Sequence, residues 1–186
     1  MLKTYFAPKP LDYDGSQLHS VFAFNEFDVQ GGSLVGFIGA CQVDMDNMVD
    51  QQDVKDQKFI FSHQMVHFVL ELFELDLERG VLYQRLLVDH LKKELELQKK
   101  SLKLERRGND LYDGKAKLNV SIATLSPVST LIHVGINVIS KETPVLTKGL
   151  KDYGIVPATF AKNILKNFSA EYESIQMSRT KVRGVS

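Results

Sequence analysis

The sequence predicts an α+β fold in which helices cover one face of a mainly antiparallel sheet. Residues 117–122 and 130–138 alternate between two sets of side chains with the period of two that marks half-buried strands. Residues 78–99 and 157–175 instead repeat apolar residues every three or four positions, as amphipathic helices do. Strands and helices of these kinds are typical of the α+β class.

The first part of the chain carries weaker signals. Residues 6–15 contain two prolines, which predicts an extended lead-in. Residues 20–24 and 33–40 are strand candidates separated by a glycine-rich turn. Residues 44–56 are acidic and poorly patterned, which indicates a loop or a short helix. Apolar residues within 62–73 recur at helical spacing behind a serine suited to an N-cap, so a helix is expected there.

The second part of the chain is patterned more clearly. A helix is expected over 78–99, followed by three strands that end near Ile139, and Pro157 begins a last helix. The sequence shows no internal repeat and no low-complexity tract. At this length, residues 1–186 are expected to form a single domain.

Composition indicates an ordinary soluble protein, with 44% hydrophobic and 25% charged residues. The apolar runs are too short to span a bilayer and the N-terminus does not resemble a signal peptide, so no membrane partner is expected. The single cysteine, Cys41, cannot form an internal disulfide or build a thiolate zinc site alone. A cytoplasmic location is therefore expected.

Charge is unevenly distributed along the chain. Residues 1–78 hold 13 acids and 4 bases, a balance of −9, and residues 79–186 hold the compensating excess of +9. Clustered bases can bind nucleic acid, but neutralisation of one part by the other within the fold is the favoured interpretation, so nucleic acid is not an expected partner.

The pair Asp113-Gly114 between two strand-like runs predicts a two-residue hairpin turn. With that turn, Tyr112 faces Lys115 and Asp110 faces Lys117. If Leu125 then pairs with Ser129, the next hairpin places Lys117 opposite Asn137.

These registers predict a polar row across three strands. The row consists of Asp110, Lys117 and Asn137, with Asn119, Ser121, His133 and Gly135 beside it. A glycine within a strand indicates close approach by a ligand or another backbone. The alternative is a solvated sheet face whose Asp–Lys pair contributes less than about 1 kcal/mol.

The same residues resemble the central motif of biotin protein ligases. The matching segments are Asn109-Asp110-Leu111-Tyr112, Lys117-Leu118 and Gly135-Ile136-Asn137, and lipoate–protein ligases have a similar Arg-x-Asn-Asp segment with a downstream lysine. The resemblance implies that Lys117 contacts the acyl carboxylate and α-phosphate of an acyl-adenylate. It also implies that Asn109 and Asp110 handle nucleotide and metal, so ATP and Mg²⁺ are the implied cofactors.

Nearly the whole chain also resembles the domain-of-unknown-function family 366. That resemblance implies the fold shared by biotin/lipoate protein ligases and class II aminoacyl-tRNA synthetases. Two features depart from the biotin ligases: their Gly/Arg-rich loop has no counterpart, and Val120 replaces a glycine at the cofactor ring. Biotin is therefore not the expected substrate.

The leading hypothesis is a small-molecule-binding, ATP-dependent, adenylate-forming ligase or acyltransferase. Lys117 and Asp110 are its expected catalytic residues. The expected cofactor-binding residues are Arg107, Asn109, Asn119, Ser121, His133, Gly135 and Asn137. One alternative is a non-catalytic binding module that keeps the fold without the closing loop. The expected partner is an unknown small molecule, and exposed strand edges favour a homodimer.

A third hypothesis concerns His63, His67 and Glu71, which are spaced four residues apart. On a helix they would share one face, where two histidines and a carboxylate can bind a metal ion. They would then form the centre of a metal-dependent hydrolase. An ordinary polar helix face is the alternative.

Overall fold

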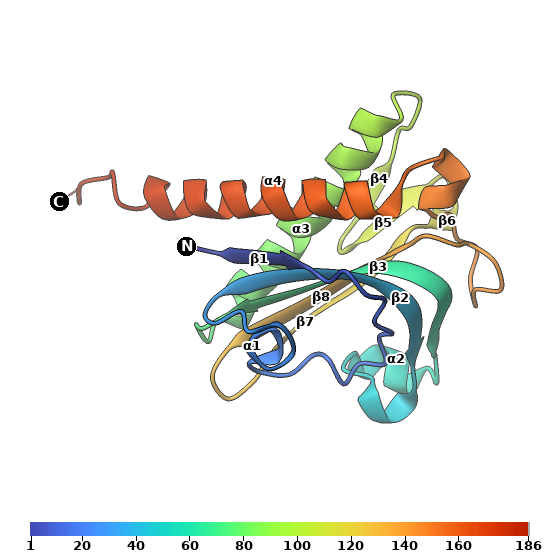
Figure 1. Ribbon diagram of the computed structural model, residues 1–186, viewed down its shortest axis with the longest axis horizontal. Helices are drawn as coiled ribbons and strands as arrows, with labels where there is room; N and C mark the ends of the chain where they lie inside the picture. The colour runs from blue at the N-terminus through green and yellow to red at the C-terminus, as the bar shows by residue number, and fades with distance from the viewer. Residues whose placement is uncertain (186) are drawn as a thin grey trace.

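The computed structural model describes residues 1–185 and contains a five-stranded sheet in the order β1-β2-β3-β8-β7 (Figure 1). Its strands are β1 (Lys3–Phe6), β2 (Ser33–Val43), β3 (Ile60–Leu72), β8 (Thr130–Asn137) and β7 (Asn119–Leu125). β1 runs parallel to β2, and the other three pairs are antiparallel. The predicted α+β class with a mainly antiparallel sheet is therefore confirmed.

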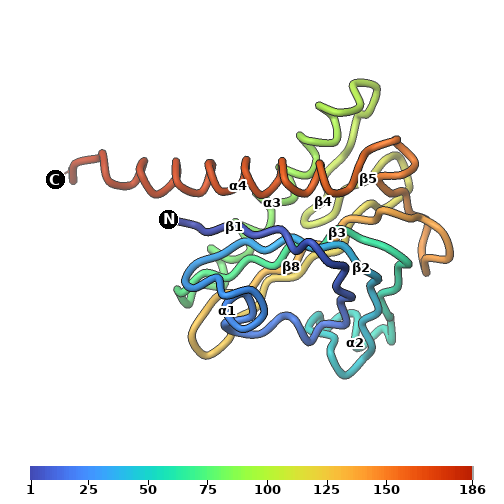
Figure 2. Tube along the Cα trace, viewed as in Figure 1, coloured from blue at the N-terminus to red at the C-terminus, as the bar shows by residue number. Residues whose placement is uncertain are grey.

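Two long helices, α3 (Leu77–Gln98) and α4 (Pro157–Ser178), cover one face of this sheet (Figures 1 and 2). α3 packs on β7 and β8, and α4 packs on β1 and β2. The carboxylate of Asp76 caps α3 by accepting a hydrogen bond from the Arg79 N–H at 2.9 Å. Both helices lie where their apolar periodicity predicted them, because that stripe supplies the side chains buried against the sheet.

The N-terminal strand β1 lies along α4 on this helical face (Figure 2). The Leu2 N–H donates to the Glu173 carboxylate at 2.5 Å, and the Ser169 hydroxyl donates to the Leu2 carbonyl at 3.1 Å. β1 is therefore held between β2 on one side and α4 above it.

The opposite face of the sheet is covered by the N-terminal segment and by the β2–β3 connection. The N-terminal segment contains the short helix α1 (Phe22–Phe27). The strand predicted over 20–24 was therefore wrong. Val21 has φ +60°, and its N–H donates to the Glu71 carboxylate, so the backbone turns there instead of continuing as a strand. The β2–β3 connection holds η1 (Met45–Asn47) and α2 (Gln51–Lys55), as the acidic pattern predicted. None of the helices among residues 1–185 is long and apolar enough to cross a bilayer.

The helix predicted over 62–73 is wrong, because those residues form β3 in the middle of the sheet. Both faces of β3 are buried, one under the helices and the other under the N-terminal segment. A strand buried on both sides has a nearly continuous apolar run, which also satisfies helical spacing.

A smaller three-stranded sheet consists of β4 (Glu105–Arg107), β5 (Asp110–Asp113) and β6 (Ala116–Lys117). Its second turn differs from the prediction, because Asp113 pairs with Ala116 and leaves Gly114 and Lys115 as the turn. The Asp113 carboxylate accepts hydrogen bonds from Lys148 and from Tyr153, which lies in η2 (Leu150–Tyr153). These contacts keep Asp113 in the strand.

The predicted register between β7 and β8 is wrong by one residue. Leu125 pairs with Thr130 instead of Ser129, because the connecting turn closes through hydrogen bonds between Ser126 and Ser129. Asn119 and Ser121 therefore share the helical face of the sheet with Val134 and Ile136, whereas Val120 and Ile122 share the opposite face with Gly135 and His133.

Candidate functional site

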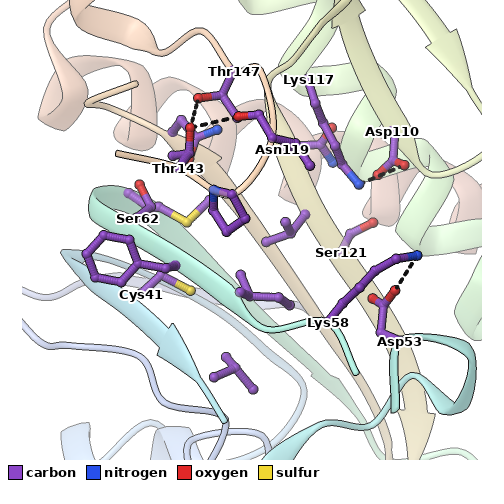
Figure 3. Close-up of a pocket in the computed structure, with 18 of the residues that line it drawn as sticks. Cys41, Asp53, Lys58, Ser62, Asp110, Lys117, Asn119, Ser121, Thr143 and Thr147 are labelled. Carbon is purple, nitrogen blue, oxygen red and sulfur yellow. Dashed lines mark hydrogen bonds and ion pairs between the residues drawn. The ribbon is translucent and has the colours of Figure 1, made fainter. Parts of the chain in front are cut away.

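A cavity of about 610 Å³ opens on the sheet face opposite α3 and α4 (Figure 3). Three segments surround its mouth: the β2–β3 connection, the β5–β6 hairpin and residues 143–147. Its lining divides into a charged rim and an apolar inner wall. The sequence motif lies at the charged rim.

The rim is dominated by the ion pair between Lys117 and Asp110, whose Nζ and Oδ2 atoms lie 2.9 Å apart. Their side chains are 29% and 28% exposed, so both are partly desolvated and still reachable by a ligand. Tyr112, not Asp110, is the cross-strand partner of Lys117. Asp110 lies on β5, two residues before Tyr112, and its carboxylate reaches Lys117 on β6 diagonally. The predicted proximity of the two charges therefore holds, although its predicted register does not.

A second set of charges faces this pair from the β2–β3 connection (Figure 3). The Lys58 ammonium lies 2.8 Å from the Asp56 carboxylate and 3.5 Å from that of Asp53. The sequence motif gave no indication of these residues, because they lie in an irregular acidic segment far from it in the chain. Figure 3 shows Lys58 and Asp53 on the same side of the cavity as Lys117 and Asp110.

Asn119 and Ser121 support the hairpin. The Asn119 side chain accepts a hydrogen bond from the Leu111 N–H at 2.6 Å and donates to the Asn109 carbonyl at 3.0 Å. The Ser121 hydroxyl also donates to the Asn109 carbonyl, and it accepts from Gln84 of α3. These bonds fix the backbone on both sides of Asp110 and so hold its carboxylate toward Lys117.

The inner wall is apolar and is built by side chains of the sheet and of the segments that cover its non-helical face. It is formed by Tyr13, Cys41, Val43, Met48, Met65, Val120 and Ile122. Burial raises the pKa of the Cys41 thiol to about 12, so this thiol stays protonated near neutral pH and is not a nucleophile. Burial likewise raises the pKa of the Tyr13 hydroxyl.

Two polar side chains of β8, Asn137 and His133, interrupt this wall. Asn137 is 5% exposed and its side chain makes no hydrogen bond to residues 1–185, although its amide atoms are not fully enclosed. Its amide is therefore available to a ligand. Thr143 and Thr147, hydrogen-bonded to each other at 2.8 Å, lie nearby in a loop without periodicity that sequence reasoning missed.

Two expected binding residues lie outside the cavity lining. The Arg107 guanidinium pairs with Glu105 at 2.5 Å and stacks over the Tyr112 ring. Gly135 faces its neighbours instead of a ligand: a Cβ there would lie 3.1 Å from the Met65 methyl and 3.3 Å from the His133 ring. The close approach that a strand glycine indicates is real, but the approaching groups are protein side chains.

The predicted metal site is not assembled. His63, His67 and Glu71 lie on a strand, where residues four apart are separated by about 13 Å. Glu71 is buried, accepting hydrogen bonds from the Val21 N–H and the Ser129 hydroxyl, while exposed His63 pairs with Glu142. Within residues 1–185, no three His, Cys, Asp or Glu side chains form a group that could hold a metal ion. The hydrolase hypothesis depended on a helix and is wrong.

Proteins of similar sequence and structure are known. The uncharacterized protein MJ0805 of Methanocaldococcus jannaschii is 39% identical over 178 residues, which cover 92% of this chain and 80% of the relative. A solved protein of unknown function from Pyrococcus horikoshi is 36% identical, with a TM-score of 0.94 over the full length of both chains.

More distant structures share the fold. The biotin protein ligase of Aquifex aeolicus superposes with a TM-score of 0.59 at 16% identity, over 95% of this chain and 72% of the ligase. A lipoate–protein ligase A bound with ATP is similar as well, with a TM-score of 0.57 at 12% identity over 92% of this chain and 85% of that chain. At such identities the likeness shows the fold alone, which is the predicted biotin/lipoate ligase-like, class II synthetase-like fold. The sequence profile described as "Domain of unknown function (DUF366)" matches residues 2–183, and the chain belongs to that family.

Proposed function

We propose that this cavity binds a small carboxylic acid together with ATP and forms an acyl-adenylate. The observation that carries the proposal is the Lys117–Asp110 pair at the rim of a cavity on a ligase-like fold. An ammonium at this position can neutralise both a ligand carboxylate and the charge that develops on a transferring phosphate. The apolar inner wall would then take the body of the acid.

The reaction proposed is a single displacement at phosphorus. A carboxylate oxygen of the acid attacks the α-phosphorus of ATP, the bond from that phosphorus to the bridging oxygen breaks, and pyrophosphate leaves with the electron pair. Lys117 binds the carboxylate and the α-phosphate in one place, which brings the reacting atoms together. Asn109 and Asn137 orient the two ligands.

The rim also suits a magnesium ion accompanying the nucleotide. Mg²⁺ prefers oxygen ligands and is commonly held by one or two carboxylates with substrate phosphates completing its shell. Asp110 and Asp53 both line the cavity and offer such oxygens. When bound there, the ion would neutralise the pyrophosphate leaving group.

The test combines ligand binding with product release. Calorimetry and thermal shift with MgATP and a panel of carboxylic acids should show binding to the parent protein, and pyrophosphate release should follow when both ligands are present. Lys117→Ala should lose binding at least tenfold while unfolding at the same temperature. Lys166→Ala, which removes an exposed lysine from α4, is the matched control and should behave like the parent.

A non-catalytic binding module is the second candidate. The observation in its favour is that Lys58, the cavity lysine of the β2–β3 connection, is already paired with Asp53 and Asp56. That pairing leaves less free positive charge for a triphosphate. Acid or nucleotide binding that depends on Lys117, without any pyrophosphate release, would favour this candidate over the ligase.

A further inference from the structure

The outer side of β1 is a free edge of the five-stranded sheet. β2 pairs with β1 on one side, and among residues 1–185 no strand lies on the other. The N–H groups of Lys3 and Ala7 donate to the carbonyl oxygens of residues 32 and 36 at 2.9 Å and 2.8 Å. Because alternate residues of a strand bond to the same neighbour, the N–H and C=O groups of Thr4 and Phe6 point away from β2. These four backbone groups can bond to one further strand.

This free edge is bounded at both ends. At its start, α4 already bonds to the backbone of Leu2 through the side chains of Glu173 and Ser169. At its other end, Pro8 has no N–H to donate. The edge that remains, from Thr4 to Phe6, is long enough to pair with a short extended segment and too short to extend the sheet further.

A groove of about 520 Å³ runs along this edge, between β1 and the side of α4. Phe6 packs against the core under the helices, whereas Tyr5 packs against the core of the opposite face, so the side chain of Thr4 lies with Phe6 on the helical face. Lys162 and Lys166 of α4 line the groove and are exposed. The Lys162 ammonium lies 5.6 Å from the centroid of the Phe6 ring, so positive charge lies directly beside the free edge.

The charge of these two lysines is not neutralised within the groove. Neither Lys162 nor Lys166 forms an ion pair with residues 1–185. The acid that lines the groove, Glu173, lies at the end near Leu2 and accepts a hydrogen bond from the Leu2 N–H. The end of the groove near Phe6 is therefore suited to a negatively charged ligand.

The spacing of the two lysines matches the spacing of side chains on an added strand. α4 runs along β1, since Ser169 contacts Leu2 and Lys162 contacts Phe6 (Figure 2). Residues four apart on a helix are separated by about 6 Å along its axis, and alternate side chains of a strand are about 6.4–6.8 Å apart. A strand paired with β1 would therefore bring two alternate side chains, both on the helical face, beside Lys162 and Lys166.

We propose that the free edge of β1 binds an extended acidic segment of another protein. The segment adds to the sheet as a strand, and two carboxylates spaced two residues apart pair with Lys162 and Lys166. Backbone hydrogen bonds to Thr4 and Phe6 supply affinity, and the ion pairs supply the preference for acidic sequences. The cavity opens on the other face of the sheet, so this site is separate from the site of the proposed function.

A second copy of this chain suits the edge less well. β1 itself contains no acid. If two copies paired through β1, their two-fold axis would pass through the free edge, beside which Lys162 and Lys166 lie. The lysines of both copies would then gather on one face, and like charges at such an interface oppose association.

The first measurement is the binding of a synthetic peptide. The peptide Ser-Thr-Glu-Val-Glu-Thr-Ser reads the same in both directions, so it tests both strand orientations, and Ser-Thr-Gln-Val-Gln-Thr-Ser is its neutral counterpart. The parent protein should bind the acidic peptide about fivefold more tightly, and added salt should reduce this preference. Combining Lys162→Glu with Lys166→Glu should abolish the preference. Combining Lys100→Glu with Lys103→Glu changes the net charge equally at two exposed lysines elsewhere and should preserve it.

The second measurement is amide hydrogen exchange, followed by NMR with and without the acidic peptide. Bound peptide should slow the exchange of the Thr4 and Phe6 amides and leave that of Tyr5, whose N–H already faces β2, unchanged. Thr4→Pro removes one outward N–H without removing a bond to β2, and it should weaken peptide binding about fivefold or more.

Three outcomes would overturn the proposal. Equal affinity for the two peptides, or a preference that survives the exchange of Lys162 and Lys166 for glutamate, would rule out recognition of acidic sequences. Unchanged exchange of the Thr4 and Phe6 amides would rule out an added strand. A dimer of the parent protein in sedimentation velocity that Thr4→Pro dissociates would show that a second copy occupies the edge instead. Each of these outcomes leaves the proposed function of the cavity untouched.

Discussion

Acidification should weaken the fold through two buried histidines, His67 on β3 and His133 on β8. His67 has a pKa near 6.5 when the chain is unfolded, and burial lowers it to about 4 in the fold. Between these values the unfolded chain binds a proton that the folded chain does not, so unfolding becomes more favourable as the pH falls. The contribution is fully present above about pH 6.5 and is progressively lost below it.

The magnitude follows from the size of the shift. A pH of about 5 lies about 1.5 units below the pKa of the His67 imidazole in the unfolded chain, whereas the same ring in the folded chain is still largely neutral. The free energy of unfolding therefore falls by about 2 kcal/mol, at about 1.36 kcal/mol per pH unit. His133 acts in the same direction, since burial also lowers its pKa. Half-buried His90 adds a smaller effect of the same sign. A loss of at least about 2 kcal/mol is therefore expected between about pH 7.5 and pH 5.

Urea denaturation at the two pH values measures this loss. His67→Phe removes one titrating group, so the difference in unfolding free energy between the two pH values should shrink, whatever the variant's absolute stability. His19→Asn removes an exposed histidine and is the matched control, with a pH dependence like that of the parent. If the parent is equally stable at both pH values, or if His67→Phe retains the full dependence, the two rings are not buried as neutral groups and the reasoning fails.

Three further outcomes test the support of the site. Asn119→Leu should lower the free energy of unfolding in urea by about 1–3 kcal/mol, because it leaves the buried Leu111 N–H unpaired. A decrease below about 0.5 kcal/mol would contradict the support of the hairpin by Asn119. Gly39→Ala should lower the unfolding temperature sharply, by the equivalent of about 3 kcal/mol or more, because its Cβ would lie 2.0 Å from the Leu11 carbonyl oxygen; a normal melting curve would show that this segment yields freely. Hydrogen bonds from Lys148 and Tyr153 hold the pKa of Asp113 below its ordinary value, so its stabilising effect is present above about pH 4 and is lost as the pH falls further. Asp113→Asn should therefore reduce the pH dependence of the unfolding free energy below about pH 4, and an unchanged pH dependence would contradict this role of Asp113.

The parts of the fold that the sequence predicted are those with a single periodic signal. α3 and α4 each bury one stripe and expose the rest, so their periodicity is unambiguous. β3 buries both faces, and its apolar run satisfied the helical template equally well. The metal hypothesis failed with it, since it used the same helical spacing.

The sequence predicted several of the residues of the candidate site, but it predicted their arrangement less well. Alternation correctly divided β8 into two faces, and it placed His133 and Asn137 on the face that lines the cavity. It could not give the length of the turn after Leu125, and one extra turn residue moved Asn119 and Ser121 to the helical face. Those two side chains tolerate that face because the Asn109 carbonyl and Gln84 satisfy them, a tertiary arrangement that no local pattern encodes. Lys58 and Thr147 reach the cavity from irregular loops and carry no periodic signal at all.

The contacts between Leu2 and α4 set an order of events during synthesis. β1 leaves the ribosome before α4, but the side chains that hold the backbone of Leu2, directly before β1, are Ser169 and Glu173 of that helix. Until α4 has emerged, β1 lacks that clamp and β2 presents an open sheet edge to other chains. A nascent chain stalled or truncated before α4 is therefore expected to pair more readily with other chains, and the emergence of α4 is the step that secures β1 along the edge of β2.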